Sequence, residues 1–106
     1  MIDYVQVVTA TSSEEEAQKI ARTLVQQRLA ASAQILGPLT SMYWWKGKIE
    51  TSREWQCTAK TRKDLYDQVA QTIQQLHSYE VPSILAVPIL AGSASYLEWL
   101  DREVVG

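Results

Sequence analysis

Residues 42–55 read MYWWKGKIETSREW, and the architecture of the chain depends on them. They hold three of the four tryptophans in a chain that has no phenylalanine. Lys46-Gly47-Lys48 predicts a hairpin turn, because glycine permits the backbone angles that tight turns need. The aromatic residues before the turn and residues 49–61 after it therefore predict two long antiparallel strands. Gly37-Pro38 predicts a β-bulge in the first of them, since proline lacks the N–H that a sheet requires.

The segment before the hairpin predicts a strand, a helix and a further extended stretch. Residues 4–9 are β-branched or aromatic with partial alternation, which is typical of a strand. Ser12 and Ser13 each precede a glutamate by three residues, which is the spacing of a capping box. Apolar residues then recur at three- and four-residue steps, so the helix is expected to end near Leu29. Residues 30–35 are extended and lead into the hairpin.

After the hairpin, the pattern predicts a helix, a strand and a short final helix. Thr61 is expected to cap the first of these helices, which runs to about Leu76. Residues 84–90 are nearly all apolar, which predicts a central strand or one covered on both faces. Pro88 within that strand requires a sheet edge or a bulge. The last short helix starts at Gly92-Ser93.

The order of these elements predicts an α+β fold. Two βαβ-like halves give a ferredoxin-like βαββαβ sandwich, with one sheet, two helices on one face and a short C-terminal helix. Right-handed crossovers place the first and third strands at the centre of the sheet. The length of 106 residues indicates a single domain, residues 1–106.

The predicted hairpin is longer than such a sandwich needs. Its arms of about ten residues would extend roughly 30 Å, beyond the two helices. Its rings would then lie in water, where a contiguous apolar patch promotes association. We therefore expect the hairpin to be an oligomerisation arm, while packing of the rings inside the monomer remains the alternative. The rings concerned are Tyr43, Trp44, Trp45 and Trp55.

Composition and the absence of known motifs disfavour several classes of function. A net charge of −2 disfavours nucleic acid as a partner, because phosphate binding needs clustered positive charge. The chain has no asparagine and no RNP1 pattern, which disfavours an acylphosphatase and an RNA-binding sheet of the same topology. No signal peptide or bilayer-spanning stretch is apparent, and one cysteine, Cys57, fits a reducing cytoplasm. No nucleophilic, phosphate-binding or zinc-binding motif is present, so we expect no enzymatic activity.

Several separated motifs resemble the CutA family of divalent-cation tolerance proteins. The resemblance runs from Val5 to Leu100, and the motifs occur in the family's order. They are Ser41-Met-Tyr43-Trp-Trp45-Lys-Gly47-Lys48, Glu54, Lys60-Thr61, His77-x-Tyr79-x-x-Pro82 and Tyr96-x-x-Trp99-Leu100.

The resemblance implies a homotrimer similar to the PII signalling proteins, with hairpins that reach across subunits. Trp44, Trp45 and Trp55 would lie in the trimer interface. The resemblance also implies ligand clefts between subunits. The residues lining them would be Tyr43, Trp45, Glu54, Lys60, His77 and Tyr79.

The family name implies a response to metal ions, and some members bind copper. Thr9, Ser32 and Ser83 stand here at positions where relatives often carry cysteine, cysteine and glutamate. His77 and Glu80 are then the expected ligands of a weakly bound divalent ion, copper or zinc, with Glu54 as a further candidate. The resemblance implies no shared catalytic reaction.

Alternative roles remain open for the same residues. His77 could instead cap the preceding helix, and Lys60 could form an ion pair or bind an anion. Cys57 is expected to be a buried structural residue. The protein as a whole could act through metal or a small ligand, or as a PII-like scaffold that binds a protein partner.

Overall fold

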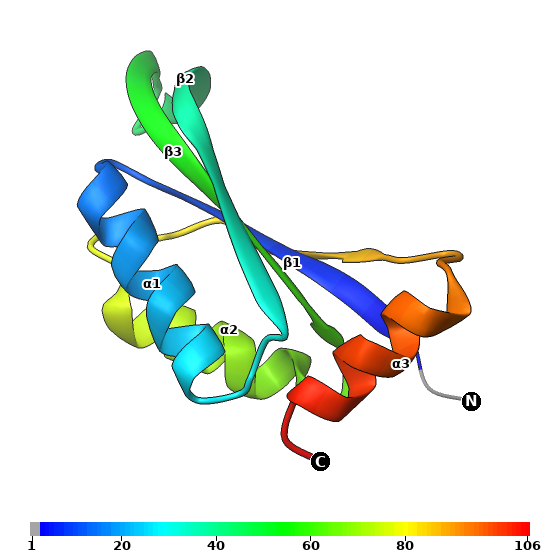
Figure 1. The fold of residues 1–106 in the computed structure, drawn as a ribbon. Coiled ribbons are helices and arrows are strands. Elements are labelled where there is room, and N and C mark those ends of the chain that lie inside the picture. The colour runs from blue at the N-terminus through cyan, green and yellow to red at the C-terminus, as the bar shows by residue number, and fades with distance from the viewer. Residues whose placement is uncertain (1–2) are drawn as a thin grey trace.

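Four strands form one antiparallel sheet in the computed structural model, which describes residues 3–106 (Figure 1). The elements are β1 (Tyr4–Thr11), α1 (Glu14–Gln26), β2 (Ser32–Trp45), β3 (Lys48–Arg62), α2 (Tyr66–Leu76), β4 (Ile84–Pro88) and α3 (Ala94–Glu103). The strand order is β2-β3-β1-β4, so β3 and β1 are central. The predicted α+β class, βαββαβ order and central strands are confirmed.

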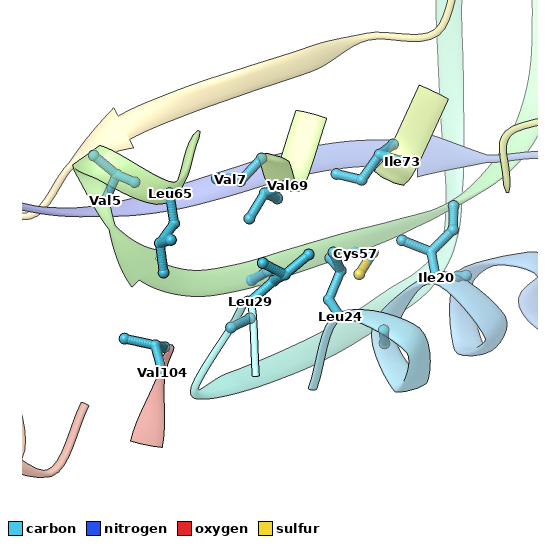
Figure 2. Packing of buried hydrophobic residues seen from close by; sticks show 14 residues of the cluster. Val5, Val7, Ile20, Leu24, Leu29, Cys57, Leu65, Val69, Ile73 and Val104 are labelled. Carbon is cyan, nitrogen blue, oxygen red and sulfur yellow. The ribbon is translucent and has the colours of Figure 1, made fainter. Parts of the chain in front are cut away.

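The core lies between the sheet and helices α1 and α2, which cover one of its faces (Figures 1 and 2). Burial alternates along β1, where Val5 and Val7 face the helices. α1 contributes Ile20 and Leu24 to this core, and α2 contributes Val69 and Ile73. Val104, after α3, joins the same cluster. Each of these side chains stabilises the fold by about 1.5–3 kcal/mol through burial.

The start of α1 follows the predicted cap, but its end does not. The Ser13 hydroxyl accepts a 3.2 Å hydrogen bond from the Glu16 backbone N–H, as a capping serine should. The helix ends at Gln26 instead of near Leu29. Arg28 adopts a left-handed backbone, with φ of 56°, and the chain turns there toward β2.

The prediction that Thr61 caps α2 is wrong. Thr61 is still part of β3, and its hydroxyl donates a 2.6 Å hydrogen bond to the Leu29 carbonyl. The chain enters α2 through a 3₁₀ turn, Lys63–Leu65, and neither element has a side-chain cap. The Thr61 hydroxyl, which the local pattern assigned to the cap of α2, therefore forms a long-range hydrogen bond instead.

The hairpin turn consists of Lys46 and Gly47, which have φ angles of 50° and 81°. Positive φ at both central residues is the geometry of a two-residue turn that matches strand twist. Lys48 is already paired with Trp45 as the first residue of β3. In Figure 1 the hairpin runs well past α1 and α2, as its predicted length requires.

The predicted bulge lies at Gly37-Pro38. The register of β2 against β3 shifts between Leu36 and Leu39 at this point. A Cβ on Gly37 would come within 2.5 Å of the Trp55 ring, so only glycine leaves room for this tryptophan. The bulge therefore positions Trp55 at the base of the hairpin.

The prediction that residues 84–90 form a central or doubly covered strand is wrong. β4 pairs only with β1 and ends at Pro88, so it is an edge strand, as Pro88 required. Leu85 is 60% exposed and Val87 is also exposed. The apolar side chains of β4 thus lie on a surface of the isolated chain.

Candidate functional site

The predicted polar residues meet where the loop after α2 crosses the end of β1. His77 is the first residue of that loop and is buried. Its Nε2 lies 2.8 Å from the Ala10 carbonyl, and its Nδ1 accepts from the Tyr79 backbone N–H at 3.2 Å. This pattern indicates a neutral imidazole protonated on Nε2. Both ring nitrogens therefore hold the loop in place.

Glu16 holds the same loop from α1. Its carboxylate accepts hydrogen bonds from the Ser78 backbone N–H at 2.9 Å and from the Ser78 hydroxyl at 3.1 Å. Sequence reasoning assigned Glu16 only to the cap of α1 and did not single out Ser78. No local signal links the two, because 62 positions separate them in the chain.

Glu54 and Tyr79 form the closest polar pair of the site. The Tyr79 hydroxyl donates to Glu54 Oε2 at 2.7 Å, and Glu54 is only 8% exposed. Burial raises the pKa of Tyr79, and the hydrogen bond and charge of Glu54 raise it further. The phenol therefore remains a hydrogen-bond donor at neutral pH.

Tyr43 and Trp45 lie on the hairpin near this pair. By strand alternation they share the sheet face of Glu54. The Tyr43 hydroxyl is 3.2 Å from that of Ser52, and Tyr43 is close enough to Tyr79 to affect its pKa. The Nζ of Lys46 lies 5.5 Å from the centre of the Trp45 ring. Both aromatic rings are partly exposed.

One chain does not bring Lys60 to this site. Lys60 lies six residues beyond Glu54 on the same strand, which is about 20 Å along β3. Its Nζ donates a 2.9 Å hydrogen bond to the amide oxygen of Gln34. A cleft that contains both Lys60 and Glu54 would therefore need two copies of the chain.

The tryptophans expected at an interface differ in exposure. Trp44 is 72% exposed near the hairpin tip, and Trp45 is 38% exposed. Trp55 is half-buried against the bulge, with the Arg53 guanidinium 6.0 Å from its ring centre. Trp44 is thus the most accessible of the three within one chain.

The described part of one chain does not supply a complete set of metal ligands. Glu80 is exposed, and residues 3–106 contain no group of three or more His, Cys, Asp or Glu side chains placed to hold an ion. Thr9 is fully buried, and burial raises the pKa of the Cys57 thiol to about 11, which disfavours a thiolate ligand. An ion at His77 would have to displace a backbone hydrogen bond and recruit ligands from elsewhere.

None of the described helices is both long and apolar enough to cross a bilayer.

The fold and the polar site define a class: ferredoxin-like α+β proteins with an extended hairpin. The crystal structure of CutA1 from Oryza sativa has this fold, with a TM-score of 0.95 and 32% identity, and the alignment covers 98% of this chain and 95% of that one. The CutA1 structure from Thermus thermophilus gives a TM-score of 0.93 at 36% identity, over 96% of this chain and 99% of that one.

The sequence comparisons narrow this class to one family. The family described as CutA1 divalent ion tolerance protein matches residues 5–103. The divalent-cation tolerance protein CutA of Archaeoglobus fulgidus is 40% identical over 97 residues, which are 92% of this chain and 93% of that protein. The chain therefore belongs to the CutA1 divalent ion tolerance family, as its motifs predicted. The names of these relatives state no enzymatic activity.

Proposed function

We propose that this protein is a non-enzymatic homotrimer that binds a divalent ion or small ligand in clefts between its subunits, as part of the cell's tolerance of metal ions. The relatives' names supply the link to divalent cations. The structure of the chain supports the assembly, because a single copy exposes a set of apolar side chains to solvent.

The exposed hairpin is the observation that carries the proposal. Met42 and Trp44 are each 72% exposed, and Ile49 is 63% exposed on the facing strand. Burying one such side chain in an interface is worth about 2–3 kcal/mol. Three hairpins that cross between subunits would cover these residues and make folding depend on assembly. We accordingly expect high thermal stability.

The proposed clefts contain the residues that one chain already places together. Glu54 and Tyr79 lie at the base of the hairpin, with Tyr43 and then Trp45 further along it toward the turn. A second copy would bring Lys60 to the same cleft. We assign a weakly bound copper or zinc ion to His77 and Glu80, completed by groups of a neighbouring subunit.

Two measurements on the purified chain test the proposal. Light scattering should give about three times the chain mass of 12.0 kDa at micromolar concentration. Titration calorimetry with copper or zinc salts should give heat that the His77→Ala variant loses. A stable species of 12.0 kDa would overturn the assembly, and normal ion binding by the variant would remove His77 from the site.

A second candidate is a trimeric PII-like scaffold whose output is a protein partner. The network that fixes the loop after α2 favours it, because both nitrogens of His77 are already engaged. Absence of heat with metal salts, together with recovery of one specific partner, would support the scaffold. In either case we place the protein in the cytoplasm, where its one thiol, Cys57, stays reduced.

A further inference from the structure

Glu54 is the only carboxylate that the described part of the chain buries. Its single hydrogen bond within residues 3–106 comes from the neutral phenol of Tyr79. Every ion pair in this part of the chain lies elsewhere, at Arg28 and Arg62. A buried carboxylate with one neutral donor is poorly compensated, because desolvation of a charge costs several kcal/mol. Glu54 therefore lacks a positively charged partner among residues 3–106.

The other oxygen of the Glu54 carboxylate can accept a hydrogen bond from a positively charged partner. Glu54 Oε1 accepts no hydrogen bond from residues 3–106, yet it is not among the fully enclosed side-chain atoms. Water or a ligand can therefore reach it. The surroundings favour a cation, since a second carboxylate, that of Glu16, lies at the same loop and accepts hydrogen bonds from Ser78.

Aromatic rings flank the carboxylate. The Tyr79 ring packs against His77 with centroids 4.9 Å apart. The Tyr43 hydroxyl lies 3.2 Å from that of Ser52, which is two residues from Glu54 on the same face of β3. The faces of such rings attract cations, most strongly where the cation is shielded from water. One carboxylate beside two tyrosines is a poor set of ligands for a transition metal, which prefers imidazole and thiolate. The same set suits an ammonium group, which donates hydrogen bonds to carboxylate and contacts ring faces.

We propose that Glu54, Tyr43 and Tyr79 bind an organic ammonium group, which donates a hydrogen bond to Glu54 Oε1 and rests against the tyrosine rings. This inference rests on the proposed function in treating the base of the hairpin as the ligand site. It names the chemical class of the ligand there, an alkylammonium cation in place of a metal ion.

The ammonium group can come from a free amine or from a lysine of another copy of the chain. Lys60 is the lysine to test, because it has no carboxylate partner among residues 3–106. It lies on the same sheet face as Glu54 but about 20 Å away along β3, so it cannot reach Glu54 of its own chain.

Calorimetric titration of the full chain with n-butylammonium chloride tests the proposal, with n-butanol as the uncharged probe of similar shape. Butylammonium should bind at least about tenfold more tightly than butanol, as expected for a charge-assisted hydrogen bond. Glu54→Gln should lose about tenfold in affinity for the amine. Glu50→Gln, which removes the same charge from an exposed position on β3, should bind within about twofold of the natural chain.

The titrations of the natural chain and its variants either support or overturn the ammonium site. Binding by the natural chain that Glu54→Gln weakens about tenfold or more supports a free amine as the ligand. Binding only after Lys60→Gln assigns the ammonium group to Lys60 of a second copy. The proposal is overturned if neither the natural chain nor Lys60→Gln binds butylammonium. It is also overturned if Glu54→Gln binds with the same affinity as the natural chain. If Glu54→Gln fails to fold, Tyr43→Leu decides instead, because unchanged affinity without this exposed ring is incompatible with the site.

Light scattering on the same samples separates this inference from the proposed assembly. A trimer that binds no amine, with or without Lys60, contradicts the ammonium site alone. A single 12.0 kDa chain that binds butylammonium through Glu54 contradicts the assembly and leaves the ammonium site standing.

Discussion

The hydroxyl of Tyr79 lies 2.7 Å from Glu54 Oε2 and joins two parts of the chain that are 25 residues apart. Glu54 belongs to β3, near the bulge, while Tyr79 belongs to the loop after α2. Two other residues of this loop hold it to the rest of the fold: His77 bonds to β1 and Ser78 bonds to α1. One short loop thus fixes the relative positions of the sheet and of the N-terminus of α1.

Removing the Tyr79 hydroxyl should destabilise the protein. In Tyr79→Phe, the buried carboxylate of Glu54 loses its only donor among residues 3–106, and we expect a loss of about 1–3 kcal/mol. Tyr66→Phe is the control, because Tyr66 makes no side-chain hydrogen bond within the described chain and should change stability by less than about 0.5 kcal/mol. Denaturant unfolding measures both variants, and equal stabilities would show that water replaces the phenol at no cost.

Stability should fall as the solution becomes alkaline. The pKa of Cys57 rises from 9.0 to about 11 on folding, because burial disfavours the thiolate. The folded thiol keeps its proton while the unfolded one releases it. The contribution is therefore complete below pH 9.0 and is lost as pH rises through about 11.

Cys57→Ala isolates this effect, since Tyr79, whose pKa is also raised, remains in the variant. Unfolding free energies measured at several pH values should fall less steeply for the variant between pH 9.0 and about 11. Parallel curves for the two proteins would mean that the thiol is accessible to water in the folded state.

Local patterns predicted the order of the elements, while long-range contacts decided the details. Alternation and the turn at Lys46-Gly47 were sufficient for the hairpin, because both depend on neighbouring residues. Thr61 was assigned to the wrong role because its partner, Leu29, is 32 residues away. The apolar sequence of β4 predicted burial, yet its place at the edge of the sheet depends on pairing with β1 alone, which its own composition does not encode.

The candidate site was predicted only in part. The motifs supplied Glu54, His77 and Tyr79, and the structure brings them together. They could not reveal that both imidazole nitrogens are engaged or that Glu16 binds Ser78, because loop geometry determines those contacts.

Gly37 should not tolerate a side chain. In Gly37→Ala the new methyl group would meet the Trp55 ring at 2.5 Å, so we expect a loss of about 1–3 kcal/mol. The double variant Gly37→Ala/Trp55→Leu should recover part of this loss relative to Trp55→Leu alone. Unfolding measurements on the four proteins of this cycle give the coupling. Additive losses would show that the two residues do not restrict each other.

Trp44→Glu should weaken self-association without removing contacts within one chain. Trp44 is 72% exposed, so a glutamate there disturbs little within one chain. Within an interface, loss of an aromatic residue that acts as a hot spot costs about 2 kcal/mol or more. Sedimentation at decreasing concentration measures the change, and Gln74→Glu on an exposed position of α2 controls for added charge. Identical association of the natural chain and Trp44→Glu would place this ring outside any interface.

Two buried threonines should respond in opposite directions to the same substitution. Thr9 and Thr61 are both fully buried on β1 and β3, and valine matches each in shape. The Thr61 hydroxyl donates to the Leu29 carbonyl at 2.6 Å, so Thr61→Val strands a buried acceptor and should cost about 1–2 kcal/mol. The Thr9 hydroxyl has no hydrogen-bond partner within residues 3–106. Thr9→Val therefore removes a buried polar group that is not hydrogen-bonded there, and it should stabilise the protein by about 1 kcal/mol. Thermal and denaturant unfolding of the two variants, measured side by side, should give shifts of opposite sign. A loss at Thr9 comparable with that at Thr61 would mean that an ordered water, or another copy of the chain, satisfies the Thr9 hydroxyl.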